Sequence, residues 1–276
     1  MVLGAGGKPE VLAEAARLRP ALEAATEIVV WDFEFAADLS TVEADLALVM
    51  GGDGSILRAA HQMGQRQRPV LGVNLGKLGF LADLSPDELL AALPDIVRGD
   101  YRVIEHLMIE CSLWRGEERV WSEQGLNELA LLAGPPFEML RADLYVDREL
   151  VTTYSCDGLI VSTPVGSTAH NLSAGGPILR KDLQALVISP ISPHTLTNRP
   201  VVDTADRVYE IGVASTATPS IVVDGRVLGV VGPHERLRVC RAKPTFKMVE
   251  TAGKSYYRTL REKLGWGGSL FFDGPK

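Results

Sequence analysis

Hydrophobic residues in the first hundred positions follow two alternating patterns. Three short apolar runs have the length and continuity of buried strands: 28–31, 46–50 and 70–73. Between and after them, apolar residues recur at helical spacing in three stretches: after Pro9, from Ile56 to about Gly64, and after Pro86. Strands that alternate with helices predict a small α/β sheet.

From Tyr101 onward, strand-like segments dominate: 103–113, 120–121, 140–146, 159–162, 208–213, 221–223, 227–231 and 237–239. Turn signals such as Asp224-Gly225 separate them, which is typical of an all-β domain with sheets packed as a sandwich. The stretch 255–264 is helical again, and we expect it to pack on the first domain. The sequence therefore predicts an α/β N-terminal domain (residues 1–100 with 250–276) and a β-sandwich C-terminal domain (residues 101–249).

Composition narrows the possible partners. The chain has 276 residues, of which 46% are hydrophobic, and a formal net charge of −7, which argues against general affinity for nucleic acid or acidic membranes. Its three cysteines lie far apart, which fits a reducing cytosol better than a disulfide scaffold or a zinc site. No apolar run approaches the roughly 18 residues that span a bilayer, and the start does not resemble a signal peptide. We expect a cytoplasmic protein.

The first candidate for chemistry is Gly51-Gly52-Asp53-Gly54, here called the GGDG loop. It connects a predicted buried strand to a predicted helix, so backbone N–H groups and the positive end of the helix dipole face a cleft that suits phosphates. A carboxylate at Asp53 would repel phosphate unless it takes part in chemistry or holds a metal. The alternative is a tight turn in which Asp53 caps the next helix.

Two further segments suit a nucleoside. Asn127-Glu128 places an amide beside a carboxylate at a strand edge, where they can grip a ribose diol or an adenine edge; the alternative is a polar strand start. The run 157–177 is rich in Gly, Ser and Thr and offers hydroxyls and an amide close together. A run of this length inside a β-rich domain is costly to order unless its contacts are used.

Seven segments, in this order and spacing, resemble the NAD kinase family over nearly the whole chain: 51–54, 72–81, 127–128, 157–177, 192–196 with 199–200, 224–226 and 263–266. The resemblance implies that the γ-phosphoryl group of ATP is transferred to the 2′-hydroxyl of the adenosine ribose of NAD, giving NADP. It also implies a divalent metal ion such as Mg²⁺, and a homodimer or homotetramer. It leaves open whether polyphosphate also serves as a donor.

The resemblance assigns Asp53 the role of general base. Gly54 would let the backbone approach the phosphates, and Arg58, one helical turn later, is placed to neutralise their charge. Other positions are assigned to nucleotide binding: Gly52, Asn127, Glu128, Asp157, Thr168, Ala169, His170, Asn171, Leu172, Ser173, Arg226 and, across a subunit interface, Ser192. No residue is assigned as a metal ligand.

Three positions depart from the family pattern. Ser55 replaces the usual Thr and keeps its hydroxyl, while Val165 replaces a usual Thr or Ser and loses one. His170 replaces a usual Tyr, so a smaller ring would stack on the base or nicotinamide. Two other functions stay in view: a lipid or sugar kinase that shares the GGDG loop, and a dinucleotide sensor without catalysis.

Overall fold

The computed structural model describes residues 1–76, 79–134, 139–195, 197–213, 218–232, 234–251 and 255–266. Lys77, Leu78 and Leu196, from the motifs quoted above, lie outside the described residues, as do 252–254 and 267–276 of the predicted first domain. The chain divides into two units. The α/β unit holds Met1–Met63, Arg68–Ile104 and Lys247–Lys276, and the β unit holds Gly64–Gln67 and Glu105–Phe246. The predicted fold class, an α/β part followed by a β-rich part, is confirmed.

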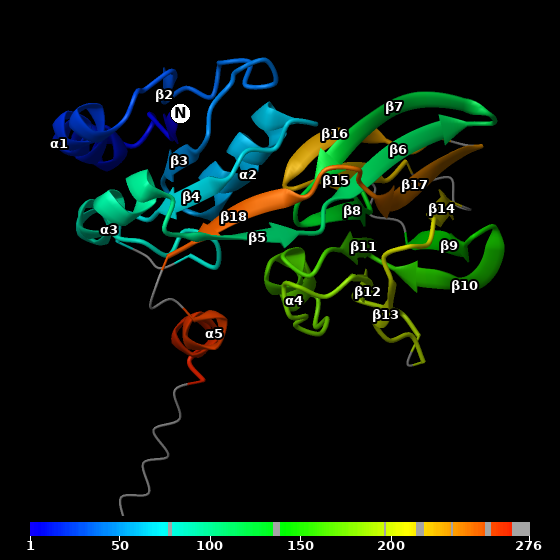
Figure 1. Cartoon of the computed structure of the whole chain (residues 1–276). Helices are drawn as coiled ribbons and strands as arrows, with labels where there is room; N and C mark the ends of the chain where they lie inside the picture. The colour runs from blue at the N-terminus through cyan, green and yellow to red at the C-terminus, as the bar shows by residue number, and fades with distance from the viewer. Residues whose placement is uncertain are drawn as a thin grey trace, which may run out of the picture. The chain divides into compact units, whose positions relative to one another are not determined.

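The sheet of the α/β unit has the strand order β2-β1-β3-β4-β18-β5 (Figure 1). Its strands are β1 (Val2–Gly4), β2 (Trp31–Asp32), β3 (Ala47–Met50), β4 (Val70–Val73), β18 (Phe246–Glu250) and β5 (Arg102–His106). The pairs from β2 to β18 are parallel. The predicted strand 28–31 is mostly wrong, because β1 offers pairing partners only from Val2, which lies opposite Trp31.

Helices cover both faces of this sheet. They are α1 (Pro9–Ala25), α2 (Asp53–Met63) and α3 (Pro86–Arg98). A further helix, α5 (Tyr256–Leu264), occurs late in the chain. Leu18 of α1 and Leu89 of α3 pack in one cluster with Leu48 and Leu71 of the sheet. Since side chains alternate along a strand, Gly72 faces the other way, and a Cβ there would lie 2.7 Å from Ile56 of α2. This close approach holds the start of α2 against the sheet.

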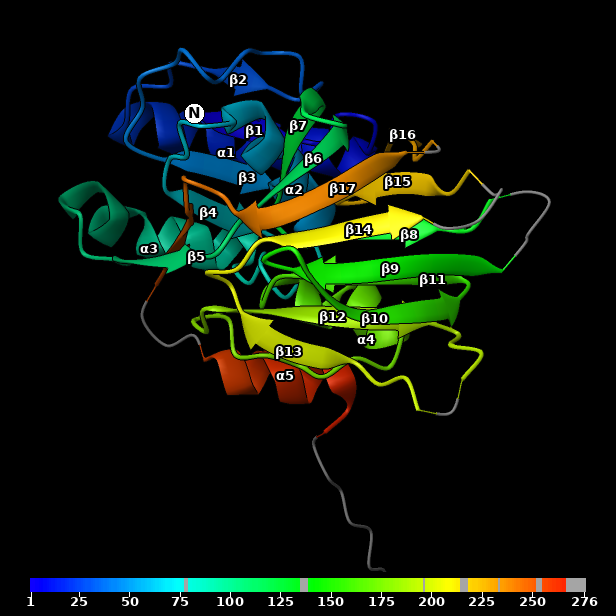
Figure 2. The same ribbon diagram turned by 90° about the vertical axis from the view of Figure 1, so that its right-hand side faces the viewer.

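The β unit consists of two antiparallel six-stranded sheets, ordered β10-β9-β14-β17-β6-β7 and β13-β12-β11-β8-β15-β16 (Figure 2). The strands are β6 (Ile109–Arg115), β7 (Glu118–Gly125), β8 (Glu128–Leu132), β9 (Leu140–Val146), β10 (Glu149–Cys156), β11 (Gly158–Ser162), β12 (Ala185–Ile191), β13 (Val201–Thr204), β14 (Tyr209–Val213), β15 (Ser220–Val223), β16 (Arg226–Val230) and β17 (Glu235–Arg241). The predicted single strand 103–113 is wrong: it is β5 and β6, which belong to different sheets on either side of Leu107-Met108.

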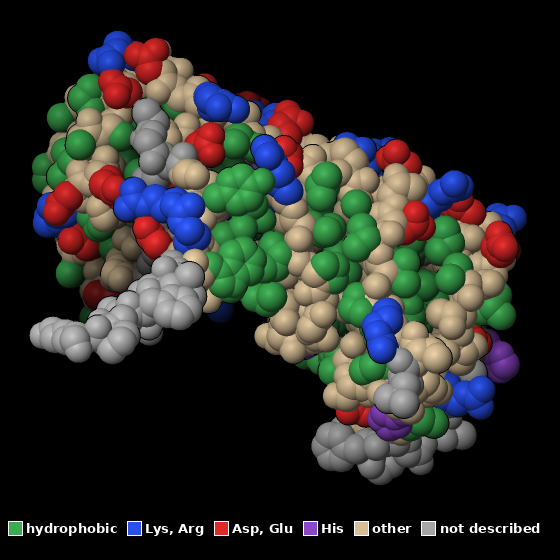
Figure 3. All heavy atoms as spheres, turned by 90° about the horizontal axis from the view of Figure 1, so that it is seen from below, with side chains coloured by type: hydrophobic (Ala, Val, Ile, Leu, Met, Phe, Trp, Pro, Cys, Tyr) green, Lys and Arg blue, Asp and Glu red, His purple; other side chains and the backbone are tan. Residues whose placement is uncertain are grey.

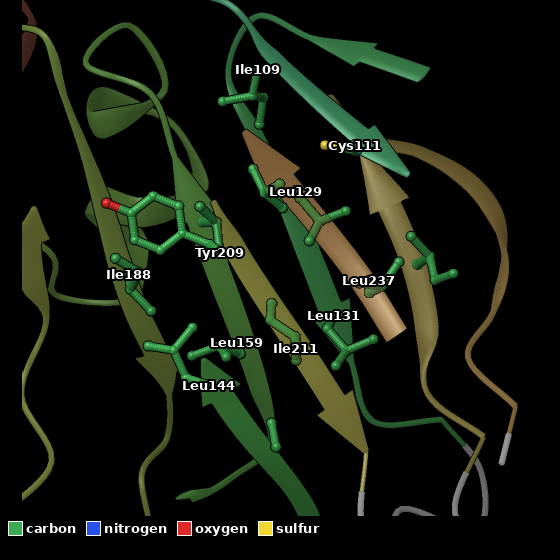
Figure 4. Close-up of a cluster of buried hydrophobic side chains, with 14 of the residues drawn as sticks. Ile109, Cys111, Leu129, Leu131, Leu144, Leu159, Ile188, Tyr209, Ile211 and Leu237 are labelled. Carbon is green, nitrogen blue, oxygen red and sulfur yellow. The ribbon is translucent and has the colours of Figure 1, made fainter. Parts of the chain in front are cut away.

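The core of the β unit lies between its two sheets. Figure 4 shows Leu144, Tyr209 and Leu237 of one sheet pointing toward Leu131 and Leu159 of the other. All five are at most 2% exposed. Between β11 and β12 the chain forms two short helical turns, η1 (Gly166–Thr168) and α4 (His170–Ser173), where the sequence indicated only a polar run.

We expect Leu159→Ala to lower the free energy of unfolding by about 2–5 kcal/mol, because it leaves a cavity between the two sheets. Val227→Ala is the matched control, since Val227 is 72% exposed on the edge strand β16, and it should change that free energy by less than about 0.5 kcal/mol. Urea denaturation of both variants gives the comparison. Equal losses would contradict the assigned core.

Candidate active site

The GGDG loop connects the end of β3 to the start of α2. Gly51 has φ +135°, donates its N–H to the Val73 carbonyl at 2.8 Å, and would place a Cβ 2.4 Å from the Ser55 Oγ. Only glycine therefore fits at position 51. A Cβ on Gly52 or Gly54 would meet nothing within 4 Å, and both residues are exposed, so the backbone at these positions is open to a ligand.

Asp53 is held by a loop far away in sequence. Its Oδ2 accepts the Phe80 N–H at 2.9 Å, and its Oδ1 accepts the N–H groups of Leu81 at 2.9 Å and Ala82 at 3.1 Å. A Cβ on Gly79 would lie 2.2 Å from Oδ1, so glycine is required there as well. Sequence reasoning missed this contact. Gly79 was the signal in the sequence that could have indicated it, since a carboxylate accepts three backbone N–H groups only where the backbone approaches it closely.

The GGDG loop lies at the carboxyl ends of parallel strands. The chain runs from β1 outward to β2 and then returns to β3 on the other side of β1. Open α/β sheets bind ligands beside such a reversal of strand order, outside the carboxyl ends of the strands. Arg58, one turn into α2, is exposed, and its guanidinium lies 5.5 Å from the centre of the Phe35 ring. The structure thus places Gly52, Asp53 and Gly54 at an edge suited to phosphates.

In the β unit, Asp224 organises the segment around Asn127-Glu128. Its carboxylate accepts the N–H groups of Leu126 at 2.7 Å, Asn127 at 2.7 Å and Glu128 at 3.1 Å. Asp224 lies in the turn between β15 and β16 with φ +48°, a conformation that aspartate tolerates better than most residues. The sequence showed this residue only as a turn signal, so its role in holding Glu128 was missed.

Glu128 is a buried acid at the start of β8. It is 7% exposed, and its Oε2 has no hydrogen-bond partner among the described residues. Burial, and secondly the charge of Asp224, raise the pKa of Glu128 to about 8, against the opposing effect of the His170 backbone N–H. A carboxyl group of this kind holds its proton at neutral pH and can donate a hydrogen bond.

Some side chains of the run 157–177 are buried within the β unit, and others are accessible to a ligand. Asn171 is fully buried: its Nδ2 donates to the carbonyls of Ser167 and Pro177 at 3.0 Å, and its Oδ1 accepts from Ser189 at 2.7 Å. Its amide is therefore used to hold the segment together. The other predicted positions are partly or fully accessible: Thr168, Ala169, His170, Leu172 and Ser173. The Asn127 carbonyl accepts the Thr163 N–H at 2.8 Å, which ties this run to Asn127-Glu128.

Asp157 and Ser192 lie at the other end of β11. Ser162 pairs with Glu128, whereas Gly158 pairs with Leu132 and Ile191. Four residues of strand correspond to about 13 Å, so Asp157 and Ser192 are remote from Glu128 within one chain. Both are exposed, and Asp157 Oδ1 lies 3.0 Å from His194 Nε2.

Arg226 is the first residue of β16, two positions after Asp224. It is exposed, and its guanidinium lies 3.7 Å from the Glu123 carboxylate. The structure therefore places the Arg226 guanidinium next to Glu123, near the end of β7.

Three further kinds of site are relevant to function: a metal centre, a membrane-spanning helix and a basic surface patch. Within the part of the chain that the structure describes, no three His, Cys, Asp or Glu side chains gather to hold a metal ion. Among the same residues, no helix combines the length and apolar character needed to cross a membrane. On the face drawn in Figure 3, Lys and Arg side chains alternate with Asp and Glu side chains and form no basic patch.

Family models match both units. The model described as the ATP-NAD kinase N-terminal domain matches residues 16–101, and the ATP-NAD kinase C-terminal domain matches residues 126–251. Among curated proteins, an NAD kinase from Rhodopirellula baltica is 56% identical over 98% of this chain and 87% of its own length. An NAD kinase from Geotalea daltonii is 42% identical over 82% of this chain and 80% of its own length.

Solved structures agree in fold. A yeast NADH kinase complexed with NADH has a TM-score of 0.84 at 21% identity and covers 98% of this chain and 89% of that one. An NAD kinase from Archaeoglobus fulgidus in complex with ATP has a TM-score of 0.75 at 26% identity, covering 97% of this chain and 99% of that one.

The raised pKa of Glu128 predicts a pH-dependent stability. Folding favours the protonated acid, so its contribution is complete below the ordinary pKa of 4.5 and is lost as the pH rises through about 8. Glu128→Gln removes this titration, and we expect the variant to gain stability relative to wild type between about pH 5 and about pH 9. Chemical denaturation across this range measures it, with exposed Glu149→Gln as the control. A stability difference independent of pH would contradict the assignment.

Proposed function

Because the chain belongs to the ATP-NAD kinase family of phosphotransferases, we propose that it transfers the γ-phosphoryl group of ATP to the 2′-hydroxyl of the adenosine ribose of NAD, giving NADP. One observation carries this proposal most directly. The Asp53 carboxylate is fixed by three backbone N–H groups at the carboxyl edge of the sheet, inside an open glycine loop. A fixed carboxylate beside bound phosphates supplies the acceptor that the hydroxyl proton requires.

In the proposed reaction, the 2′-oxygen forms a bond to the γ-phosphorus while the bond to the β–γ bridging oxygen breaks, and ADP leaves. The hydroxyl proton passes to Asp53. A carboxylate has about four lone-pair positions; Oδ1 receives two N–H groups and Oδ2 receives one. We therefore assign the proton to Oδ2, which receives fewer N–H groups than Oδ1 among the described residues. The backbone at Gly52 and Gly54 and the charge of Arg58 support the phosphates.

A divalent cation, Mg²⁺, accompanies ATP in this proposal. The described residues do not gather three His, Cys, Asp or Glu side chains that could ligate this ion. We therefore assign no protein ligand to Mg²⁺. Mg²⁺ in nucleotide enzymes is commonly held by the substrate phosphates themselves with few protein groups.

We propose that the β unit binds the dinucleotide. Asn127 and Glu128 would hold the adenosine part, and the buried carboxyl of Glu128 supports this because Oε2 has no partner among the described residues. We propose that accessible atoms of five further residues contact the dinucleotide: Thr168, Ala169, His170, Leu172 and Ser173. Arg226, which is also exposed, would add a polar contact. For Asn171 we propose an indirect role, because its amide is used inside the segment.

Asp157 and Ser192 fit this function only if a second copy of the chain takes part. They lie about 13 Å along β11 from the end at Glu128. We propose that they reach the dinucleotide of a neighbouring copy, in a homodimer or homotetramer. We also place the reaction in the cytoplasm, in keeping with three free cysteines. Size-exclusion chromatography with light scattering tests the assembly.

Asp53→Asn should lower turnover by about 10²–10⁴-fold, because the hydroxyl proton loses its acceptor, while NAD binding changes by a few fold. In this variant the Asn NH₂ group faces one of the three backbone N–H groups, and the hydrogen bond between them is lost. Thermal melting must therefore show that the variant is folded. The control is Asp87→Asn, whose carboxylate is 86% exposed at α3. Formation of NADP from NAD, Mg²⁺ and ATP is the measurement, and calorimetry gives NAD affinity. Turnover near that of wild type would exclude Asp53 as the general base.

The same assay with polyphosphate in place of ATP determines the donor range. If wild-type protein binds NAD but forms no product with either donor, the protein is a dinucleotide sensor and the proposed reaction is wrong. If sugars or lipid alcohols are phosphorylated and NAD is not, the acceptor assigned to the β unit is wrong.

A further inference from the structure

The loop that grips Asp53 also contacts the last described helix. Lys263, in the final turn of α5, places its Nζ 5.4 Å from the centre of the Phe80 ring. Phe80, Lys263 and Asp53 all belong to the α/β unit. An ammonium at this distance from an aromatic ring is attracted by the negative charge of the ring face. The C-terminal helix is thus joined to the loop that follows β4.

Phe80 contacts both Asp53, through its backbone, and Lys263, through its ring. Its backbone N–H donates to Asp53 Oδ2 at 2.9 Å, while its ring receives Lys263. The adjoining turn is closed by the Gly79 N–H, which donates to the Ala82 carbonyl at 2.8 Å. A displacement of the Phe80 ring therefore shifts a short turn whose amides at 80–82 determine where the carboxylate points.

We propose that Lys263 is a positioning residue: through the Phe80 ring it holds the loop 79–82, and with it the orientation of the Asp53 carboxylate. The proposal rests on the proposed function in so far as Asp53 receives the hydroxyl proton. Lys263 does not touch the reacting atoms in this scheme. Its effect is to raise the fraction of molecules in which the amides of 80–82 and Oδ2 are correctly placed before substrates react.

Features of α5 indicate that Lys263, and not a neighbouring cation, is the residue that acts on the loop 79–82. Leu260 is 4% exposed and is the buried residue of the helix, and Gly265 ends the helix with φ +66°. Arg258 is used in an ion pair with Glu262 at 2.8 Å. Arg261 lies two positions before Lys263, about 200° away around the helix, and is exposed to solvent. It carries the same charge on a different face.

The expected effect is modest. Cation–π contacts at exposed positions change an equilibrium by about two- to fivefold. We expect Lys263→Met, which keeps the length and apolar character of the side chain, to lower kcat by up to this factor. Lys263→Arg should retain activity because a guanidinium also stacks on an aromatic ring. Arg261→Met, the matched control on the same helix, should leave kcat unchanged.

A measurement that does not depend on activity accompanies the kinetics. Amide hydrogen exchange by NMR reports the opening of the N–H groups of residues 80–82, and we expect about two- to fivefold faster exchange in Lys263→Met. No change in Lys263→Arg or Arg261→Met is expected. If wild type forms no NADP, the proposed function fails while the exchange data still test Lys263. If NADP forms and exchange at 80–82 is unchanged in Lys263→Met, only this inference fails.

A double-mutant cycle with Phe80→Leu identifies the route. If Lys263 acts through the ring, Lys263→Met has no further effect on kcat or exchange once the ring is absent. If the effect of Lys263→Met persists in the Phe80→Leu background, Lys263 acts elsewhere and the inference is overturned. An equal loss in Arg261→Met would likewise overturn it, since the cause would then be the helix as a whole.

Discussion

The candidate loops of both units depend on one kind of contact: an aspartate carboxylate that accepts three consecutive backbone N–H groups. Asp53 accepts those of residues 80–82 in the α/β unit, and Asp224 accepts those of residues 126–128 in the β unit. A backbone segment that is not in a helix or strand leaves its amides without partners, which is costly when they are partly buried. Each carboxylate satisfies three neighbouring amides together and thereby holds a loop in place, which at Asp224 includes the first residue of β8.

The two contacts have different consequences. At Asp53, the carboxylate that holds the loop is itself the proposed proton acceptor, so the hydrogen bonds set its direction. At Asp224, the carboxylate holds the backbone of Asn127 and Glu128, and its charge adds to burial in raising the pKa of Glu128 to about 8. One aspartate is therefore oriented by a loop, whereas the other orients a loop and tunes a neighbouring acid.

Glycine makes both arrangements possible. A side chain at Gly79 would overlap Asp53, and a Cβ on Gly166 would lie 2.1 Å from the Asn127 carbonyl. A Cβ on Gly176 would likewise lie 1.9 Å from Asn171 Oδ1. These glycines are required by close approach between neighbouring segments, at Gly79 in the α/β unit and at Gly166 and Gly176 in the run 157–177. Sequence alone shows the glycines but does not show what approaches them.

The sequence by itself determined the alternation of strands and helices, the change to β structure after residue 100, and the GGDG loop, because these depend on local periodicity and turn residues. The strand register, by contrast, required the tertiary structure: it places Asp157 and Ser192 at the far end of β11 from Glu128. The partners of Asp53 and Asp224 and the burial of Asn171 were decided in the same way. Each depends on which segments the fold brings together, and the order of strands in a sheet, which no local pattern encodes, decides which of them meet.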